Sequence, residues 1–132
     1  MADIFEYAVV RAVPRVERGE CLNVGVILWC QAFGFLGART LVTPARLTVL
    51  DPAVDLDAIR AHLDALARIC EGGGGAGPAG ALTPGERFRW LTSPRSTVVQ
   101  MSPVHSGFTD DPVAELDRLT DLLVNPPVPP SA

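Results

Sequence analysis

Lysine is absent from this sequence, and all eleven of its positively charged side chains are arginines. Without a lysine amine the chain cannot form a Schiff base with a carbonyl substrate, and it lacks the cation of a Gly-Lys-Ser/Thr phosphate-binding loop. Each arginine instead carries a permanent charge on a planar group that matches carboxylates and phosphates. The positive charge of this chain therefore indicates anion recognition and not amine chemistry.

Cysteine is scarce as well, and Cys21, Cys30 and Cys70 show no Cys-x-x-Cys spacing. This excludes a disulfide framework and a thiolate zinc site, so we expect a reduced protein without metal or cofactor. The formal net charge of -4 argues against a face that binds duplex nucleic acid. No apolar run reaches the roughly 18 residues that span a bilayer, and no export signal is recognised. We therefore expect a cytoplasmic protein that does not bind membranes.

What is present fits one domain. The chain has 132 residues, of which 48% are hydrophobic and 20% are charged, which is enough to bury one core. The Pro-Pro-Val-Pro-Pro run after Asn125 is typical of a disordered end, with a polyproline ligand as the alternative. The predicted boundaries are a single domain over residues 1–125 and a proline-rich tail over residues 126–132.

Apolar residues alternate over residues 4–13, 21–30 and 33–41, which predicts three strands, the last two at hairpin spacing. Residues 97–101 predict a fourth strand. Helical spacing then predicts three helices, which begin after the capping residues Asp55, Thr83 and Asp111. The order βββααβα indicates an α+β fold with a largely antiparallel four-stranded sheet, covered by helices on one face.

Polar residues cluster where the first predicted strand turns into the second. The cluster consists of Arg11, Arg15, Arg18, Glu20 and Asn23. Planar guanidinium groups at one sheet edge could bind a phosphate or carboxylate group, with the Asn23 amide orienting the ligand. The alternative is a solvated surface in which Arg18 pairs with Glu20 and Asn23 bonds to turn backbone. The residues leave both interpretations open.

A second candidate segment contains Arg95, Ser96 and Thr97, a turn into the predicted fourth strand. These groups could hold an anion beside His105, or they could close an ordinary turn with His105 in a loop. His62 lies on the apolar side of the first predicted helix, which predicts a partly buried packing residue. The glycine-rich run over residues 72–80 is typical of a flexible loop.

The motif R-G-E-x-x-N-V-G-V over residues 18–26 is specific enough to suggest a family. Together with Tyr7 to Arg11, Pro14 and the Arg95-Ser96-Thr97 turn, it resembles the bacterial domain-of-unknown-function family numbered three-zero-three-seven. The resemblance covers nearly the whole chain. It implies no assigned activity, and it implies that a HipA-like kinase homologue is encoded nearby as a candidate partner.

Two functions follow as hypotheses. The first is a non-catalytic accessory or regulatory module that binds a protein partner, and with it a possible small anionic ligand, through the arginine-bearing edge. The second is a phosphoester- or nucleotide-handling enzyme in which Arg11, Arg18 and Arg95 clamp the anion and Glu20 is the base. Glu20 and Arg95 in one enclosed pocket would favour the enzyme, whereas a flat exposed edge would favour the module.

Overall fold

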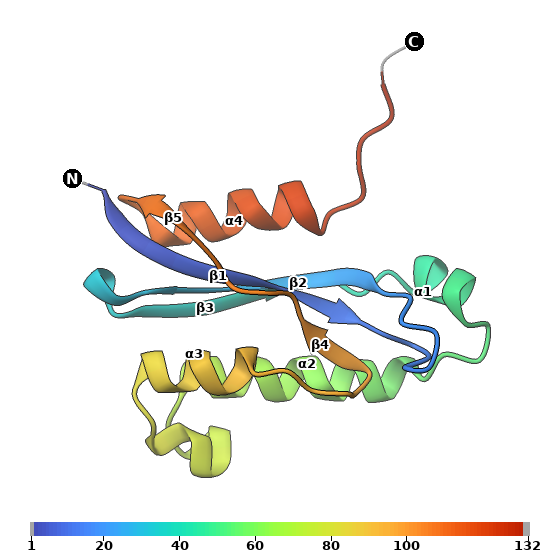
Figure 1. Cartoon of the computed structure of the whole chain (residues 1–132), viewed down its shortest axis with the longest axis horizontal. Coiled ribbons are helices and arrows are strands. Elements are labelled where there is room, and N and C mark those ends of the chain that lie inside the picture. The colour runs from blue at the N-terminus through green and yellow to red at the C-terminus, as the bar shows by residue number, and fades with distance from the viewer. Residues whose placement is uncertain (1, 131–132) are drawn as a thin grey trace.

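The first three strands form where the alternating pattern predicts them. They are β1 (Asp3–Ala12), β2 (Leu22–Cys30) and β3 (Phe35–Thr40), paired antiparallel in the spatial order β3-β2-β1 (Figure 1). The computed structural model describes residues 2–130. The third strand starts later than predicted because a 3₁₀ turn, η1 (Gln31–Phe33), closes the hairpin and ends on Gly34 at a φ of 58°.

Two short strands share the other edge of β1. They are β4 (Val99–Met101), which pairs with the end of β1, and β5 (His105–Thr109), which pairs with its beginning. Between these two strands, Ser102 forms two hydrogen bonds with Val9 of β1. The Val9 N–H donates to Ser102 Oγ at 2.8 Å, and the Ser102 N–H donates to the Val9 carbonyl at 2.9 Å.

Within residues 2–130 the sheet therefore has five strands, and the prediction of four is wrong. The sequence His-Ser-Gly-Phe-Thr of β5 offers little alternation of apolar and polar residues. Its strand conformation comes from backbone pairing with β1, a tertiary contact that outweighs local propensity. The α+β class itself is confirmed.

The described residues form four α-helices, and three of them begin after the predicted capping residues. The four helices are α1 (Pro44–Leu50), α2 (Leu56–Glu71), α3 (Pro84–Thr92) and α4 (Pro112–Leu123), with a 3₁₀ segment η2 (Gly74–Ala81) in the glycine-rich run. Asp55 and Asp111 each accept a backbone N–H in the first turn, at 3.0 Å and 3.1 Å. Thr83 and Glu86 form the predicted capping box of α3. Helix α1 was not predicted. No described helix is long and apolar enough to cross a bilayer.

Helices cover both faces of the sheet. In Figure 1, α2 and α3 lie on one side and α4 lies on the other. One core therefore joins Val10 and Ile27 to Phe88 of α3, while a second joins Val26 and Leu28 to α4. The prediction of one covered face is wrong because β2 is apolar on both sides, and a strand whose residues are buried in succession belongs between two layers.

Candidate functional site

The connection between β1 and β2 is a short, well-defined loop at one end of the sheet. Residues 15–21 are all exposed. Backbone hydrogen bonds fix the turn: the Arg18 N–H donates to the Arg15 carbonyl at 3.1 Å, and the Gly19 N–H donates to the Val16 carbonyl at 3.2 Å. Gly19 has a φ of 70°, a conformation that favours glycine. We call residues 15–21 the arginine loop.

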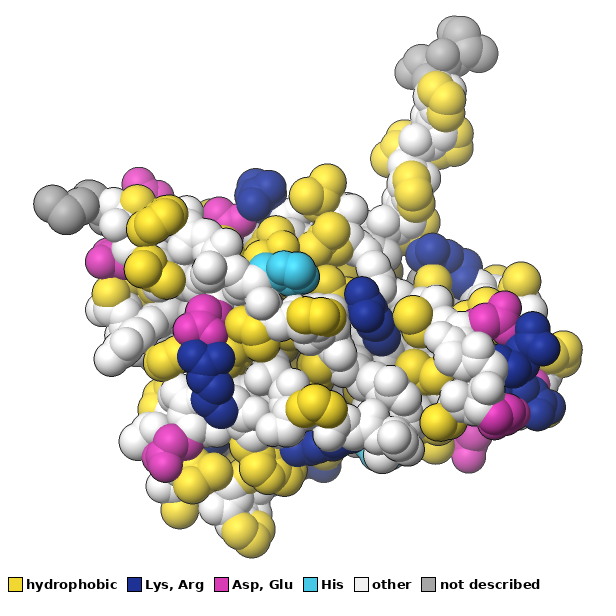
Figure 2. All heavy atoms as spheres, in the orientation of Figure 1, with side chains coloured by type: hydrophobic (Ala, Val, Ile, Leu, Met, Phe, Trp, Pro, Cys, Tyr) yellow, Lys and Arg dark blue, Asp and Glu magenta, His cyan; other side chains and the backbone are white. Residues whose placement is uncertain are grey.

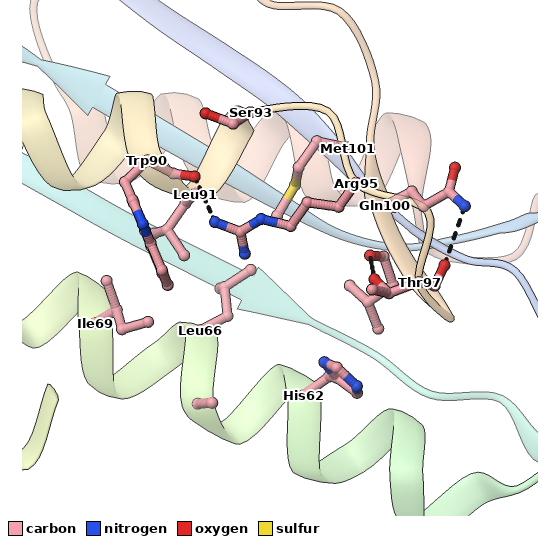
Figure 3. Close-up of a pocket in the computed structure, with 12 residues that line it drawn as sticks. His62, Leu66, Ile69, Trp90, Leu91, Ser93, Arg95, Thr97, Gln100 and Met101 are labelled. Carbon is pink, nitrogen blue, oxygen red and sulfur yellow. Dashed lines mark hydrogen bonds between the residues drawn. The ribbon is translucent and has the colours of Figure 1, made fainter. Parts of the chain in front are cut away.

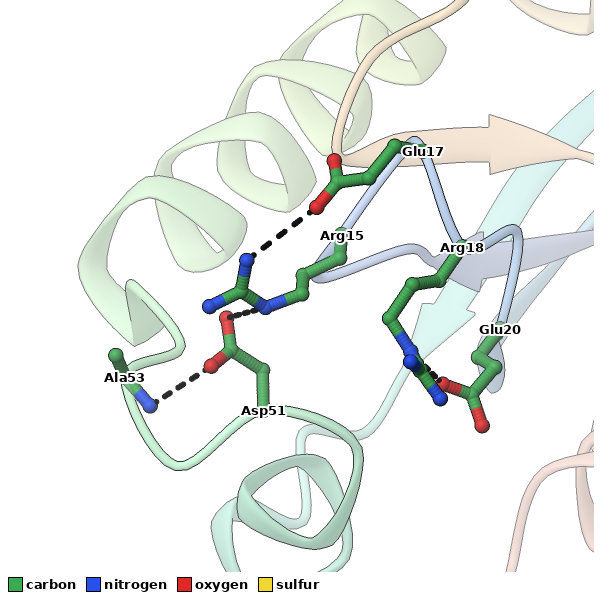
Figure 4. A network of polar contacts seen from close by, with 6 residues as sticks. All are labelled: Arg15, Glu17, Arg18, Glu20, Asp51 and Ala53. Carbon is green, nitrogen blue, oxygen red and sulfur yellow. Dashed lines mark hydrogen bonds and ion pairs between the residues drawn. The ribbon is translucent and has the colours of Figure 1, made fainter.

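Arg15 connects this loop to the α1–α2 connection (Figure 4). Its Nη1 donates to Glu17 Oε1 at 3.3 Å, and its Nε lies 3.6 Å from Asp51 Oδ2. The Asp51 side chain is 9% exposed and also accepts the Ala53 N–H at 2.9 Å. Backbone hydrogen bonding at Glu17, followed by the Arg15 side chain, lowers the pKa of Glu17.

Arg18 forms an ion pair with Glu20 on the outside of the loop. The Arg18 Nε donates to Glu20 Oε1 at 2.5 Å, and the two side chains are 60% and 46% exposed. The hydrogen bond to Glu20 raises the pKa of Arg18. In Figure 2 positive and negative side chains lie next to one another at this end of the molecule. The surface is therefore mixed in charge and solvated, and Glu20 is not buried between arginines.

Arg11 and Asn23 lie on the sheet itself, on the side of α4. Arg11 stands between Val10 and Ala12, which both belong to the core under α2, so its side chain leaves the sheet on the opposite face. Its Nε is buried and has no hydrogen-bond partner among the described residues. Asn23, opposite Arg11 in the register, donates from Nδ2 to the Leu123 carbonyl at 3.0 Å. Asn23 therefore secures the end of α4.

The second candidate segment lies beside α2 and α3 (Figure 3). The Arg11 side chain lies on the other face of the sheet. The Arg95 guanidinium group stacks 4.2 Å from the centroid of the Trp90 ring, and its Nη2 donates to the Trp90 carbonyl at 2.7 Å. Thr97 Oγ1 donates to the Val99 carbonyl at 2.7 Å. Ser96 is exposed. Arg95 and Thr97 line a cleft of about 220 Å³, with His62 and Trp90 among the other walls.

The predicted site residues are thus distributed over three places: the arginine loop, the α4 face of the sheet and the cleft beside Trp90. The cleft contains Arg95 but not Glu20, which is an exposed loop residue. An enzyme that uses Glu20 as base and Arg95 as clamp would need both groups at one enclosed substrate. This geometry does not favour the enzyme hypothesis. It shows an exposed arginine loop that lies apart from the cleft instead.

The histidines and cysteines add little catalytic chemistry. His62 is exposed at the rim of the cleft, so the prediction of a packing residue is wrong: its position on α2 is just outside the buried stripe. His105 is the first residue of β5, and its ring lies 5.3 Å from that of Tyr7. Burial raises the pKa of Cys70 to about 12, which leaves it unreactive as a thiol. The described residues hold no cluster of metal-binding side chains.

Sequence reasoning missed Trp90. This side chain is 45% exposed and borders three of the hollows on the surface. The signal was present, because Phe88 and Leu91 belong to the buried stripe of α3 and the spacing of Trp90 places it beside that stripe and not within it. A large aromatic residue outside the buried stripe indicates an exposed contact surface.

Comparison with known proteins establishes the family. The chain matches the family described as protein of unknown function, DUF3037, over residues 7–124. It therefore belongs to DUF3037, as the R-G-E-x-x-N-V-G-V motif suggested. No curated protein and no solved structure matches the chain. The match includes the arginine loop and the Trp90 cleft.

Proposed function

We propose that this protein is a small, non-catalytic binding module whose arginine loop docks onto an acidic segment of a protein partner. The observation that carries the proposal is the exposure of seven consecutive residues, 15–21, on a backbone held by local hydrogen bonds. A preformed loop loses little conformational entropy on binding. A partner carboxylate can compete with Glu20 for Arg18, because both side chains are open to solvent.

Val16 makes the loop suited to a protein partner. It is 41% exposed between charged residues, so the loop offers an apolar contact surrounded by hydrogen-bonding groups. Interfaces combine such contacts, and arginine is frequent among the residues that contribute most of the binding energy. The candidate partner is the HipA-like kinase homologue that the family resemblance implies, in a bacterial cytoplasm.

The test is one substitution, Arg18→Ala, measured by thermal melting and by calorimetric binding to the purified HipA-like homologue. We expect the melting temperature to stay within a few degrees, because solvated ion pairs contribute little. We expect binding to weaken at least about tenfold, the effect of losing an arginine that dominates an interface.

Arg118→Ala is the matched control. Arg118 is 61% exposed and pairs with Glu115 on α4, so it reproduces the ion pair at a different place on the surface. It should change neither melting nor binding. Wild-type affinity for Arg18→Ala would refute the proposal, and so would an equal loss for Arg118→Ala, because the effect would then be one of net charge.

A further inference from the structure

A groove surrounds the exposed ring of Trp90. Three hollows of about 220, 360 and 530 Å³ have Trp90 in common. The first two also share Ile69, and the last two share Leu82, so the hollows adjoin one another around the indole. We call this surface the Trp90 groove. Figure 3 shows its first part, where Trp90 and Arg95 face Leu66 and Ile69 of α2.

Two polar groups of the groove can only donate hydrogen bonds, the Arg95 guanidinium group and the Trp90 indole N–H, whereas Ser93, Thr97 and Gln100 also offer acceptor oxygens. No carboxylate lines the first two hollows. The third contains Glu86, whose Oε1 already accepts the Thr83 N–H at 3.0 Å. Arg95 uses one N–H for the Trp90 carbonyl and forms no ion pair among the described residues. The indole N–H of Trp90 lies beside it and can also only donate. An occupant that presents acceptors to Arg95 and Trp90 beside apolar surface therefore fits this part of the groove.

The proline-rich segment Pro126–Pro130 has this chemistry. Proline has a carbonyl acceptor but no N–H donor, so Val128 supplies the one backbone donor between Pro126 and Pro130. All five residues are exposed, and Val128 is 89% exposed. Segments of this composition adopt the polyproline II conformation before binding, and they bind in grooves lined by aromatic residues.

The segment cannot easily reach the groove of its own chain. It follows α4, which lies on the opposite face of the sheet from α2 and α3, and it leaves the body of the molecule on that side (Figure 1). We propose that the segment Pro126–Pro130 of one copy binds the Trp90 groove of a second copy. The contact pairs proline rings with the indole and pairs backbone carbonyls with the N–H groups of Trp90 and Arg95.

The first measurement is sedimentation of the full chain between about 10 μM and 1 mM, the range in which weak contacts saturate. We expect the average mass to rise with concentration. Two variants should each weaken this association at least about tenfold: Trp90→Ala, and a tail variant with the four prolines of the segment changed to alanine. Leu122→Ala is the control, because Leu122 is 67% exposed on α4 and lies outside the groove.

A mixture of the two variants gives the decisive result. The Trp90→Ala chain retains the segment and the tail variant retains the groove, so a mixture should associate more strongly than either variant alone. An interface that joins the same patch on both copies would not recover in this way. If Trp90→Ala does not fold, Trp90→Phe, which keeps a ring but loses the indole N–H, takes its place.

A chain that stays monomeric up to about 1 mM refutes the proposal, since that limit corresponds to a contact of negligible strength. Association of unchanged strength in either variant also refutes it, as does a mixture that associates no more strongly than the variants do alone. A peptide of residues 125–132, titrated into the tail variant and followed by tryptophan fluorescence, should bind to that variant but not to its Trp90→Ala derivative.

Discussion

Arg18 and Arg87 have the same side chain in opposite surroundings. Arg18 is exposed and has a carboxylate partner two residues away. Arg87 is 8% exposed, and no carboxylate lies within ion-pair distance of it among the described residues. Its Nη1 donates to the Leu82 carbonyl at 2.6 Å and its Nη2 to the Cys70 carbonyl at 3.4 Å. A buried cation thus lies at the end of α2, where the last carbonyls of a helix favour positive charge.

This comparison shows that arginines in a conspicuous charged cluster of the sequence need not stabilise the fold, whereas an isolated arginine can. The arginine loop is easy to recognise because its cations and anions are neighbours in the sequence. In the structure these side chains are exposed to solvent. Arg87 stands in an ordinary helix, and its partners are backbone atoms 5 and 17 residues away. Gly72 leaves room for it: a Cβ there would lie 3.0 Å from Arg87 Cζ. Substitutions of buried and exposed arginines test this contrast, and a substitution in the capping box of α3 extends it to a carboxylate.

The largest effect is expected for Arg87→Ala. We expect the free energy of unfolding in urea to fall by about 2–3 kcal/mol, because the carbonyls of Leu82 and Cys70 lose charged donors in a buried place. Arg89→Ala is the control on the same helix: Arg89 is 56% exposed and pairs with Glu6 at 2.6 Å. It should cost about 1 kcal/mol or less. If Arg89→Ala lowered the free energy of unfolding as much as Arg87→Ala, burial of the arginine would not explain its contribution to stability.

Arg15→Ala should have an intermediate effect. Its partner Asp51 is nearly buried but retains the Ala53 N–H, so the carboxylate is not left without a donor. We expect a loss of about 0.5–1 kcal/mol in urea unfolding, within the range of partly solvated ion pairs. Arg18→Ala should lower the free energy of unfolding by less than Arg15→Ala does, because neither Arg18 nor Glu20 is buried. Equal shifts for the two loop variants would mean that the buried contact to Asp51 adds nothing.

The smallest effect concerns the pH dependence of Glu86. Hydrogen bonds from the Thr83 backbone, and then from its side chain, lower the pKa of Glu86 in the folded protein. A lowered folded-state pKa stabilises the fold above the unfolded pKa of about 4.3, and this contribution is lost as the pH falls through the folded value. Glu86→Gln keeps an acceptor for the Thr83 N–H but does not ionise.

The melting temperature should therefore decrease less for Glu86→Gln than for the wild type as the pH is lowered from about 6 to about 3. The other carboxyl groups are common to both proteins and cancel in the difference. Parallel curves would show that the charge of Glu86 adds nothing to its role as an acceptor in the capping box.

The fold could be predicted to the extent that local patterns determine it. Alternation located β1 and β2, and the caps Asp55, Thr83 and Asp111 located three helices, because these signals act within a few residues. Strand β5 could not be found in this way, since its conformation depends on β1, about 100 residues earlier in the chain. The second helical layer was missed because alternation does not reveal whether both faces of a strand are covered.

The candidate site was predicted only as a set of residues. Local spacing correctly placed Arg18 beside Glu20, but it could not show that Arg11 leaves the sheet on the face of α4 whereas Arg95 lies beside α2. Trp90 stood in the sequence between residues that had already been assigned to a helix. Its spacing from Phe88 and Leu91 would have placed it outside the buried stripe of α3, but that helix was predicted from its capping box and not from its apolar face.

The position of β1 has a consequence for synthesis of the chain on the ribosome. One edge of β1 can pair with β2 soon after the hairpin emerges from the ribosome. The other edge stays unpaired until β4 and β5 have been synthesised. The hydrogen bond between Val9 and Ser102 on this edge joins residues that are 93 positions apart. Until then the nascent chain has an open strand edge, which is prone to pairing with other chains. Closure of this edge therefore depends on contacts that are distant in the sequence, and we expect any factor that shields β1 during translation to improve the yield of native protein.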